Sequence, residues 1–296
     1  MSLPAARKND PTLCVVHVSG AIDEVTSREV ETHGVQQARA GDRCLCFGGA
    51  ADLIVTGSAS VLVNGVPAAR SADRTLHGGV IFGGASEVLI GGPRTGITIG
   101  DADLSKTRAA CAAAAAGRVG GKLDQSANNC GIEACRTIIN QANGTAIRED
   151  ALMDEAYAEG NAIPDEVKGS LRKEWGSTNA EHRERILARY GIPSQRREPD
   201  MKEIAVTLSE GRGVMTAHNK GWFDLGPEMH NSLNHVVVVT AISFDENGEM
   251  VSVSVVDSSS TRCARVVSVG NFTGSFLRNK DDGSIAPMHV TDRRIW

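Results

Sequence analysis

The chain lacks the features that mark several large classes of protein. Its 296 residues carry a net charge of -5, and the pI is near 5.9, so charge gives no general attraction to nucleic acid or to an anionic membrane. No stretch approaches the roughly 18 consecutive apolar residues of a membrane-spanning helix. Arg7 and Lys8 have no apolar run behind them, which argues against a secretory signal. We therefore expect neither a nucleic-acid partner nor a membrane anchor.

Disulfide-type cysteine spacing is also missing from the second half of the chain. The seven cysteines are odd in number, which favours synthesis in a reducing compartment with thiols kept for metal binding or chemistry. We expect Cys135 and Cys263 to be ordinary core residues. With 41% hydrophobic and 23% charged residues over this length, the chain has room for two domains.

The sequence does contain one short motif that occurs three times. Its copies occupy residues 3–10, 34–42 and 65–73, and each ends in an arginine followed three residues later by an aspartate. An internal repeat fixes the architecture of the segment that carries it. Residues 54–65 and 81–92 are β-branched runs broken by Gly, Ser and Asn, a pattern that predicts strands and tight turns.

A potential metal ligand stands four residues after each of the repeated aspartates. Two of these residues are cysteines and one is a histidine, and a further histidine follows the first cysteine by three residues. Two thiolates and two imidazoles are the ligands of a closed tetrahedral zinc site. Such an ion could contribute roughly 10 kcal/mol or more to the folding of a glycine-rich segment with a small core. We predict structural zinc held by Cys14, His17, Cys46 and His77, with Cys44 and His33 as spare residues outside the register.

The third copy contains Pro67-Ala68-Ala69-Arg70, and the first contains Leu3-Pro4-Ala5-Ala6-Arg7. On these motifs, residues 1–100 resemble the PAAR-repeat proteins. The resemblance implies an all-β, three-sided cone held by a metal at its apex, whose base caps the trimeric valine-glycine-repeat spike of a type VI secretion machine. The ligands differ from those of many relatives, which use more histidine, and residues 25–30 replace a clear strand in the first repeat.

The composition changes after residue 100. Residues 101–122 are small and polar apart from the alanine-rich run 109–116, which would form only a marginal helix on its own, so we expect a linker there. Apolar residues at helical spacing then predict a helix that ends at Gly144. Cys130 lies at the start of that helix, where the partial positive charge of the helix end favours a thiolate.

The remainder of the second domain, residues 123–296, changes from helical to strand-rich patterns. Residues 148–190 are typical of amphipathic helices. We expect the switch toward strands to begin at residues 201–208 and 213–217. The domain is therefore predicted to be α+β.

A strand pair follows that brings two polar residues together. His235 opens the buried run of residues 234–242, and Asp257 closes the alternating run of residues 251–257, with a turn between the two runs. Antiparallel pairing puts both residues near one end of the hairpin. With Cys130, they make a Cys-His-Asp set of the kind that activates a thiol nucleophile.

The order Gln-x-x-x-x-Cys-Gly, then His-x-Val-Val-Val, then a strand ending in Asp resembles a papain-like cysteine peptidase, closest to the bacteriocin-leader peptidases that cut after double glycine. The resemblance implies Cys130 as nucleophile, His235 as general base and then acid, and Asp257 as the residue that orients the imidazole. It implies Gln125 as a donor of the oxyanion hole. The gap from Cys130 to His235 is longer than in leader peptidases, and Ser258 stands where they have proline.

The function expected from both resemblances is a type VI secretion effector, made in the producer cytoplasm, whose tip delivers a cysteine endopeptidase to a rival cell. A thiol works best in reducing surroundings, so the target cytoplasm is favoured. A protein substrate and a cognate immunity protein are the expected partners, and catalysis needs no cofactor. Two alternatives stay open: a deamidase or transglutaminase with the same triad, and a non-catalytic adaptor.

Further expectations concern one pair of glycines and two histidines. The peptidase could cut itself after Gly120-Gly121, ahead of Gln125. His218 and His230 lie in a loop-like segment where we expect them to be solvated, and they are the fallback histidines for His235.

Overall fold

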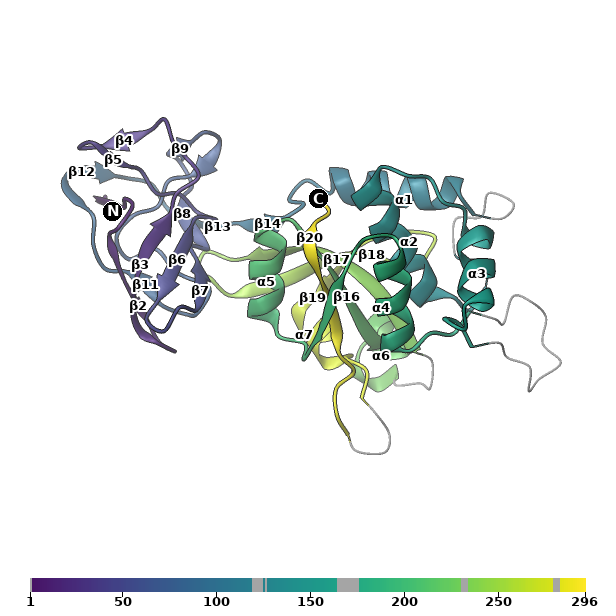
Figure 1. The fold of residues 1–296 in the computed structure, drawn as a ribbon. Helices are drawn as coiled ribbons and strands as arrows, with labels where there is room; N and C mark the ends of the chain where they lie inside the picture. The colour runs from purple at the N-terminus through teal and green to yellow at the C-terminus, as the bar shows by residue number, and fades with distance from the viewer. Residues whose placement is uncertain (1, 119–124, 126, 164–175, 230–233, 279–282) are drawn as a thin grey trace. The chain divides into compact units, whose positions relative to one another are not determined.

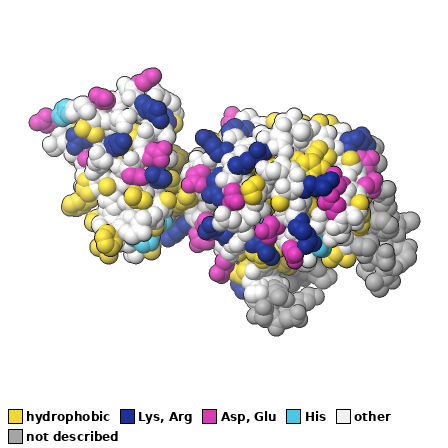
Figure 2. Space-filling model, viewed as in Figure 1, with side chains coloured by type: hydrophobic (Ala, Val, Ile, Leu, Met, Phe, Trp, Pro, Cys, Tyr) yellow, Lys and Arg dark blue, Asp and Glu magenta, His cyan; other side chains and the backbone are white. Residues whose placement is uncertain are grey.

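The computed structural model describes residues 2–118, 125, 127–163, 176–229, 234–278 and 283–296. The chain divides into two compact units (Figure 1). The first contains residues 1–99 and 242–251, and the second contains residues 100–241 and 252–296. Lys and Arg side chains are interspersed with Asp and Glu over the visible face of each unit (Figure 2). That face therefore carries no large field of one sign.

Short strands build the first unit. Five of them form a curled antiparallel sheet in the order β11-β2-β3-β6-β7. These are β2 (Pro11–Cys14), β3 (Val18–Glu24), β6 (Arg43–Cys46), β7 (Ala51–Leu53) and β11 (Val80–Ile81). The others pair in twos: β1 (Leu3–Ala5) with β12 (Ala85–Ile90), β4 (Glu31–Thr32) with β5 (Val35–Gln36), β8 (Thr56–Ser58) with β13 (Arg94–Gly96), and β9 (Leu62–Val63) with β10 (Val66–Pro67).

The three sequence copies fold into three equivalent turns. In each turn the aspartate accepts a hydrogen bond from the backbone N–H of the arginine three residues earlier, at 2.7 Å for Asp10 and 2.9 Å for both Asp42 and Asp73. The aspartate N–H in turn donates to the arginine carbonyl. This closed local bonding explains the fixed spacing of arginine and aspartate in the repeat.

The alanine before each arginine forms a ring at the centre of the unit. Ala6 donates to the Ala69 carbonyl at 3.0 Å, Ala69 to Ala38 at 3.0 Å, and Ala38 to Ala6 at 2.8 Å. All three are fully buried, so the ring leaves room only for small side chains. Gln37 breaks the symmetry, because its buried Nε2 donates to all three of these carbonyls.

The second unit combines a sheet with helices. Its strands run in the order β15-β20-β16-β17-β18-β19: β15 (Ser194–Arg197), β16 (Arg212–Asn219), β17 (Asn234–Phe244), β18 (Met250–Val256), β19 (Ala264–Ser268) and β20 (Met288–Arg294). The strand β14 (Thr98–Gly100) leads from the first unit into the second. The described helices are α1 (Ser105–Ala116), α2 (Cys130–Asn143), α3 (Glu149–Ala158), α4 (Ala180–Arg189), α5 (Met201–Ser209), α6 (Lys220–Leu225) and α7 (Val269–Gly274), with a short 3₁₀ turn η4 (Pro227–Met229).

The helix α2 is the centre of the second core. It packs against α1, α3 and α4, and its buried isoleucines share one cluster with alternate residues of β16 and β17 such as Met215 and Val238. It ends at Gly144, which takes the left-handed conformation (φ 62°) that favours glycine. The predicted helix, and the strand at 213–217, are confirmed.

Residues 201–208 are helical, so the prediction that strands begin there is wrong. Ile204, Val206 and Thr207 are β-branched and favour strands locally. However, Asp200 caps the helix by accepting from the N–H of Glu203 at 2.8 Å. Ile204 and Leu208 are then buried one turn apart, so packing decides the outcome.

The expected linker is also folded in its described part. Asp101 accepts from the N–H and the hydroxyl of Thr107, both at 2.5 Å, at the start of α1. Ala110 and Ala114 are buried on one face of this helix. A disulfide joins Cys111 to Cys263 across 152 residues, with Cα atoms 5.7 Å apart. Cys263 is buried in the core as predicted. Its disulfide was not predicted, because the pairing is tertiary and leaves no local spacing signal.

Candidate functional site

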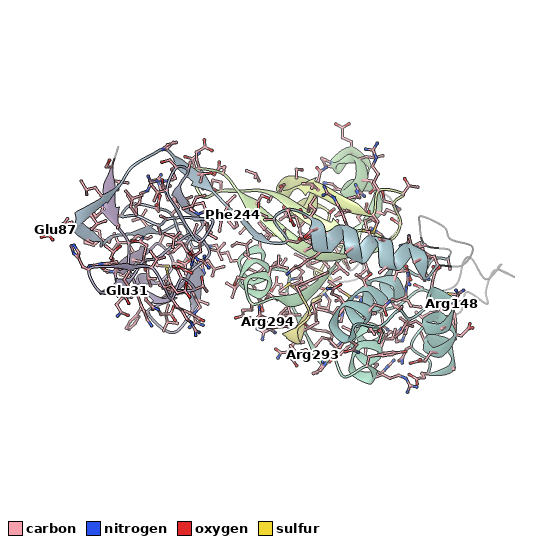
Figure 3. All side chains as sticks on the ribbon, turned by 90° about the horizontal axis from the view of Figure 1, so that it is seen from above. Glu31, Glu87, Arg148, Phe244, Arg293 and Arg294 are labelled. Atoms are coloured by element: carbon pink, nitrogen blue, oxygen red, sulfur yellow. A yellow bond between two sulfur atoms is a disulfide. The ribbon has the colours of Figure 1, made fainter. Side chains whose placement is uncertain are left out.

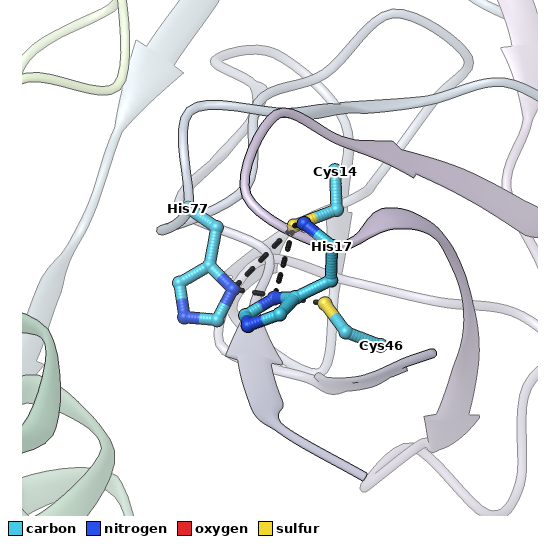
Figure 4. Close-up of side chains that lie close together, drawn as sticks. All are labelled: Cys14, His17, Cys46 and His77. Atoms are coloured by element: carbon cyan, nitrogen blue, oxygen red, sulfur yellow. Dashed lines mark hydrogen bonds between the residues drawn. The ribbon is translucent and has the colours of Figure 1, made fainter. Parts of the chain in front are cut away.

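Two side-chain clusters stand out, one in each unit. In the first unit, Cys14 ends β2, His17 lies in the turn that follows, Cys46 ends β6, and His77 comes from a loop before β11. Their four ligand atoms all lie within 4.8 Å of one another (Figure 4). The repeat places three of them, since each follows its turn by the same four residues, and the structure brings together the full predicted set.

The distances within this cluster fit a tetrahedral ion. The Cys14 Sγ lies 3.4 Å from the His17 Nδ1 and 3.6 Å from the His77 Nδ1, and the Cys46 Sγ also lies 3.6 Å from the His77 Nδ1. Zinc bonds of about 2.3 Å to sulfur and about 2.0–2.1 Å to nitrogen place such ligands about 3.5 Å apart at tetrahedral angles. The cluster could therefore hold a metal ion.

A buried carboxylate supports this cluster. Asp52 Oδ1 accepts from the backbone N–H of Leu53 at 2.8 Å and of His77 at 3.0 Å, and Oδ2 lies 3.7 Å from the His77 Nδ1. Burial and the neighbouring Cys14 thiol raise the pKa of Cys46 to about 12, so a metal would displace a proton there. Sequence reasoning missed Asp52, although it lies six residues after the ligand Cys46.

The spare residues lie outside this cluster. Cys44 is fully buried in the core, and burial raises its pKa. His33 is exposed, and its Nε2 lies 3.6 Å from Glu87.

In the second unit, Cys130 is the first residue of α2, after Asn129 as N-cap. Burial raises the pKa of its thiol, but the hydrogen bond with His235 and the charge of that ring outweigh burial and leave the pKa below its ordinary value. A hydrogen bond from the Val236 N–H and the charge of the buried Arg183 act in the same direction. The thiol therefore ionises more readily than an ordinary cysteine.

His235 and Asp257 lie in contact, at the same end of the β17–β18 hairpin. The His235 Nε2 donates to Oδ1 of Asp257 at 2.8 Å, and both side chains are buried. This bond leaves Nδ1 of the ring for the Cys130 thiol. Burial lowers the pKa of His235, but Asp257 and Cys130 together raise it to about 9. The lowered pKa of Cys130 and the raised pKa of His235 together favour a thiolate paired with an imidazolium.

Three residues that sequence reasoning missed complete the surroundings of Asp257. Ser259 donates from both its N–H and its hydroxyl to Oδ1, each at 2.9 Å. Arg265 donates from Nη1 to Oδ2 at 2.6 Å and to Asp224 at 2.6 Å. Ser259 lies in the turn that follows β18, Arg265 is on β19 and Asp224 is on α6. Nothing in the spacing of Arg265 and Asp224 links them to the triad.

Gln125 lies beside the same segment but is held by other bonds. Its Nε2 donates to the Ala127 carbonyl at 2.9 Å, and its Oε1 accepts from the hydroxyl of Ser258 at 2.8 Å. Its role in an oxyanion hole stays a prediction.

Three predicted residues remain: the fallback histidines His218 and His230, and the core cysteine Cys135. His218 is fully buried between Thr216 and Ser275, so the expectation that it is solvated is wrong. Burial lowers its pKa to about 3, which suits a neutral structural ring. His230 and Gly120-Gly121 lie outside the described residues. Cys135 is buried in the core as predicted.

Comparison with known proteins locates one motif. Residues 15–83 match the PAAR motif, a span that includes His17, Cys46 and His77 and begins one residue after Cys14. The match supports a PAAR-repeat type VI spike-tip protein and is consistent with binding to the valine-glycine-repeat spike. No curated protein matches the chain. Among the described residues, no helix is both long and apolar enough to cross a membrane.

Proposed function

We propose that the chain is a type VI secretion effector whose second unit is a papain-like cysteine endopeptidase that cleaves a protein in a rival bacterial cell. One observation carries the proposal: the Nε2 of His235 lies 2.8 Å from the buried Asp257, and the same ring lowers the pKa of the Cys130 thiol at the start of α2. This succession of thiol, imidazole and carboxylate is the arrangement that activates a nucleophile.

In the proposed first step, the Cys130 thiolate attacks the carbonyl carbon of a peptide bond. A C–S bond forms, and the carbonyl electrons move onto oxygen. The backbone N–H of Cys130, at the helix N-terminus, is the first oxyanion donor, and Gln125 is the proposed second donor. The His235 imidazolium then gives its Nδ1 proton to the leaving nitrogen, the C–N bond breaks, and a thioester remains.

The second step returns the enzyme to its starting state. Water attacks the thioester carbon while Nδ1 of His235 takes the water proton. The C–S bond breaks, the peptide acid leaves, and the thiolate and imidazolium are restored. Asp257 stays ionised in both steps, because it accepts from His235, Ser259 and Arg265, and its charge stabilises the imidazolium.

The first unit would supply delivery. The PAAR match and the Cys14, His17, Cys46 and His77 cluster support a spike-tip role with a structural metal, for which zinc is the proposed ion. The producer would need an immunity protein that blocks the Cys130 site. We place the substrate in the target cytoplasm, where the Cys130 thiol stays reduced.

Expression of the full chain in bacterial cytoplasm tests the proposal. The parent, Cys130→Ala, His235→Ala and the control His33→Ala are compared for growth, with proteome-wide identification of new protein N-termini. A peptidase gives toxicity and new termini in the parent and in His33→Ala only. Thiol-dependent toxicity with a mass change of about one unit on intact targets would indicate deamidation, and equal toxicity of all four would indicate a non-catalytic adaptor.

A further inference from the structure

A cavity of about 480 Å³ opens beside the proposed triad. It lies between α6, the segment that follows Asp257, and the start of β19, all within the second unit. Six polar or charged residues dominate its lining: Lys220, Asp224, Ser259, Ser260, Arg262 and Arg265. Three are cations and one is an anion. Lys220 and Arg265 pair with Asp224, and Arg265 also pairs with Asp257, so the excess of positive charge comes from Arg262.

The donors in this cavity outnumber the acceptors. Both oxygens of Asp224 are already used, Oδ1 by Arg265 at 2.6 Å and Oδ2 by Lys220 at 2.8 Å. Arg265 makes its bonds through Nη1, which leaves Nε and Nη2 without an acceptor in the described part of the chain. The exposed guanidinium of Arg262 forms no ion pair or hydrogen bond with any described residue. The cavity therefore offers several free N–H donors to an anionic group.

Ser259 connects the cavity to His235, the residue that protonates the leaving group in the proposed reaction. Ser259 lines the cavity, and its hydroxyl lies 3.3 Å from the Nε2 of His235. In the proposed reaction the leaving nitrogen takes its proton from Nδ1 of the same ring. In the proposed binding mode, the substrate residues that follow the scissile bond run past the imidazole toward Ser259, which lies at the Nε2 edge of the ring, and toward the cavity.

We propose that this cavity is a subsite for an aspartate or glutamate side chain within the first two residues after the scissile bond, an inference that rests on the proposed peptidase. The carboxylate would accept two parallel hydrogen bonds from the planar guanidinium of Arg262, the geometry in which arginine binds carboxylates best. Lys220 and Arg265 would add positive charge at the cavity wall. The residues after Gly120-Gly121 are Lys122 and Leu123, so the same subsite disfavours self-cleavage there.

Cleavage of a proteome-derived peptide library by the full chain tests the subsite. The library is digested with the parent, with Arg262→Glu and with the control Arg148→Glu. Arg148 is the N-cap residue of α3 (Figure 3). It is exposed, does not line the cavity, and pairs with Asp150 at 3.1 Å. We expect the parent and the control to enrich Asp and Glu over Asn and Gln about tenfold at the first two positions. The Arg262→Glu variant should lose this preference and favour Lys and Arg.

The outcomes separate the subsite from the peptidase. Cleavage by the parent without an acidic preference, or an acidic preference that Arg262→Glu leaves unchanged, would overturn the subsite and keep the peptidase. A parent that cleaves no peptide of the library would overturn both. Values of kcat and KM are then measured for two synthetic peptides that differ only in Glu or Gln at the enriched position. The subsite predicts that most of the difference in kcat/KM between them lies in KM.

Discussion

Arg265 forms an ion pair with the buried Asp257, in which Nη1 of the arginine lies 2.6 Å from Oδ2 of the aspartate. The other oxygen of Asp257 accepts from His235. Burial raises the pKa of Asp257, but the bonds from His235 and Arg265 outweigh it and hold the pKa well below its ordinary value. Asp224 and the ring of Phe223 fix the guanidinium, whose central carbon lies 5.1 Å from the ring centre. Arg265 is thus a positioning residue for the proposed triad.

Replacing this arginine should impair catalysis without touching a reacting atom. We expect Arg265→Gln to lower kcat/KM by about 10- to 100-fold, because Asp257 loses the partner that fixes its orientation. Removing a positive charge also raises the pKa of the nearby His235, so the alkaline limb of the pH profile should move to higher pH. An unchanged profile and rate, with Arg148→Gln as the control, would show that Arg265 serves packing only.

The pH dependence of cleavage should be bell-shaped. The active pair needs Cys130 deprotonated and His235 protonated. The rate should therefore rise as pH rises through the lowered pKa of the thiol, and fall as pH rises through the His235 pKa of about 9. The Asp257→Asn variant removes the main group that raises the His235 pKa, so its alkaline limb should move to lower pH. A limb that stays in place in this variant would contradict the assigned partners.

Removing one ligand from the Cys14, His17, Cys46 and His77 cluster should unfold the first unit selectively. We expect Cys14→Ala to lose bound metal, measured by mass spectrometry under non-denaturing conditions, and with it up to about 10 kcal/mol of folding free energy. His33→Ala, which removes an exposed histidine outside the cluster, should keep both metal and stability. Equal metal content in Cys14→Ala and the parent would rule out this cluster as the binding site.

The disulfide between Cys111 and Cys263 should stabilise the second unit. Because it closes a long loop, we expect Cys111→Ala to lower the free energy of unfolding by about 2–4 kcal/mol relative to the oxidised parent. The exposed Ala109→Ser on the same helix should have little effect. Adding a reductant should lower the free energy of unfolding of the parent to that of the variant. A difference that survives reduction would trace the effect to packing and not to the bond.

The sequence predicted features whose signals are local or repeated. The offset of Cys14, Cys46 and His77 from three equivalent turns is enough to bring these ligands together, because a repeat copies its geometry. Helical spacing after Cys130 placed α2, and the pattern of residues 234–257 placed the hairpin that joins His235 to Asp257.

Features that depend on tertiary packing could not be predicted in the same way. The Cys111–Cys263 pair spans 152 residues, and Arg265 reaches Asp257 only because β18 and β19 pair. Residues 201–208 carry β-branched side chains that favour strands, yet an N-cap and a buried face make them helical. The disulfide and the Arg265 contact are distant in sequence, and the helix at 201–208 forms because its cap and its buried face together outweigh the strand preference of its side chains.

The most direct test of the central claim is the rate at which iodoacetamide alkylates Cys130 in the full chain near neutral pH, read by mass spectrometry of its peptide. We expect rapid alkylation in the parent and in His33→Ala, slow alkylation in His235→Ala, and little reaction at buried Cys135, since only a paired thiolate is reactive at this pH. Equal rates for Cys130 in the parent and in His235→Ala would contradict the proposed nucleophile.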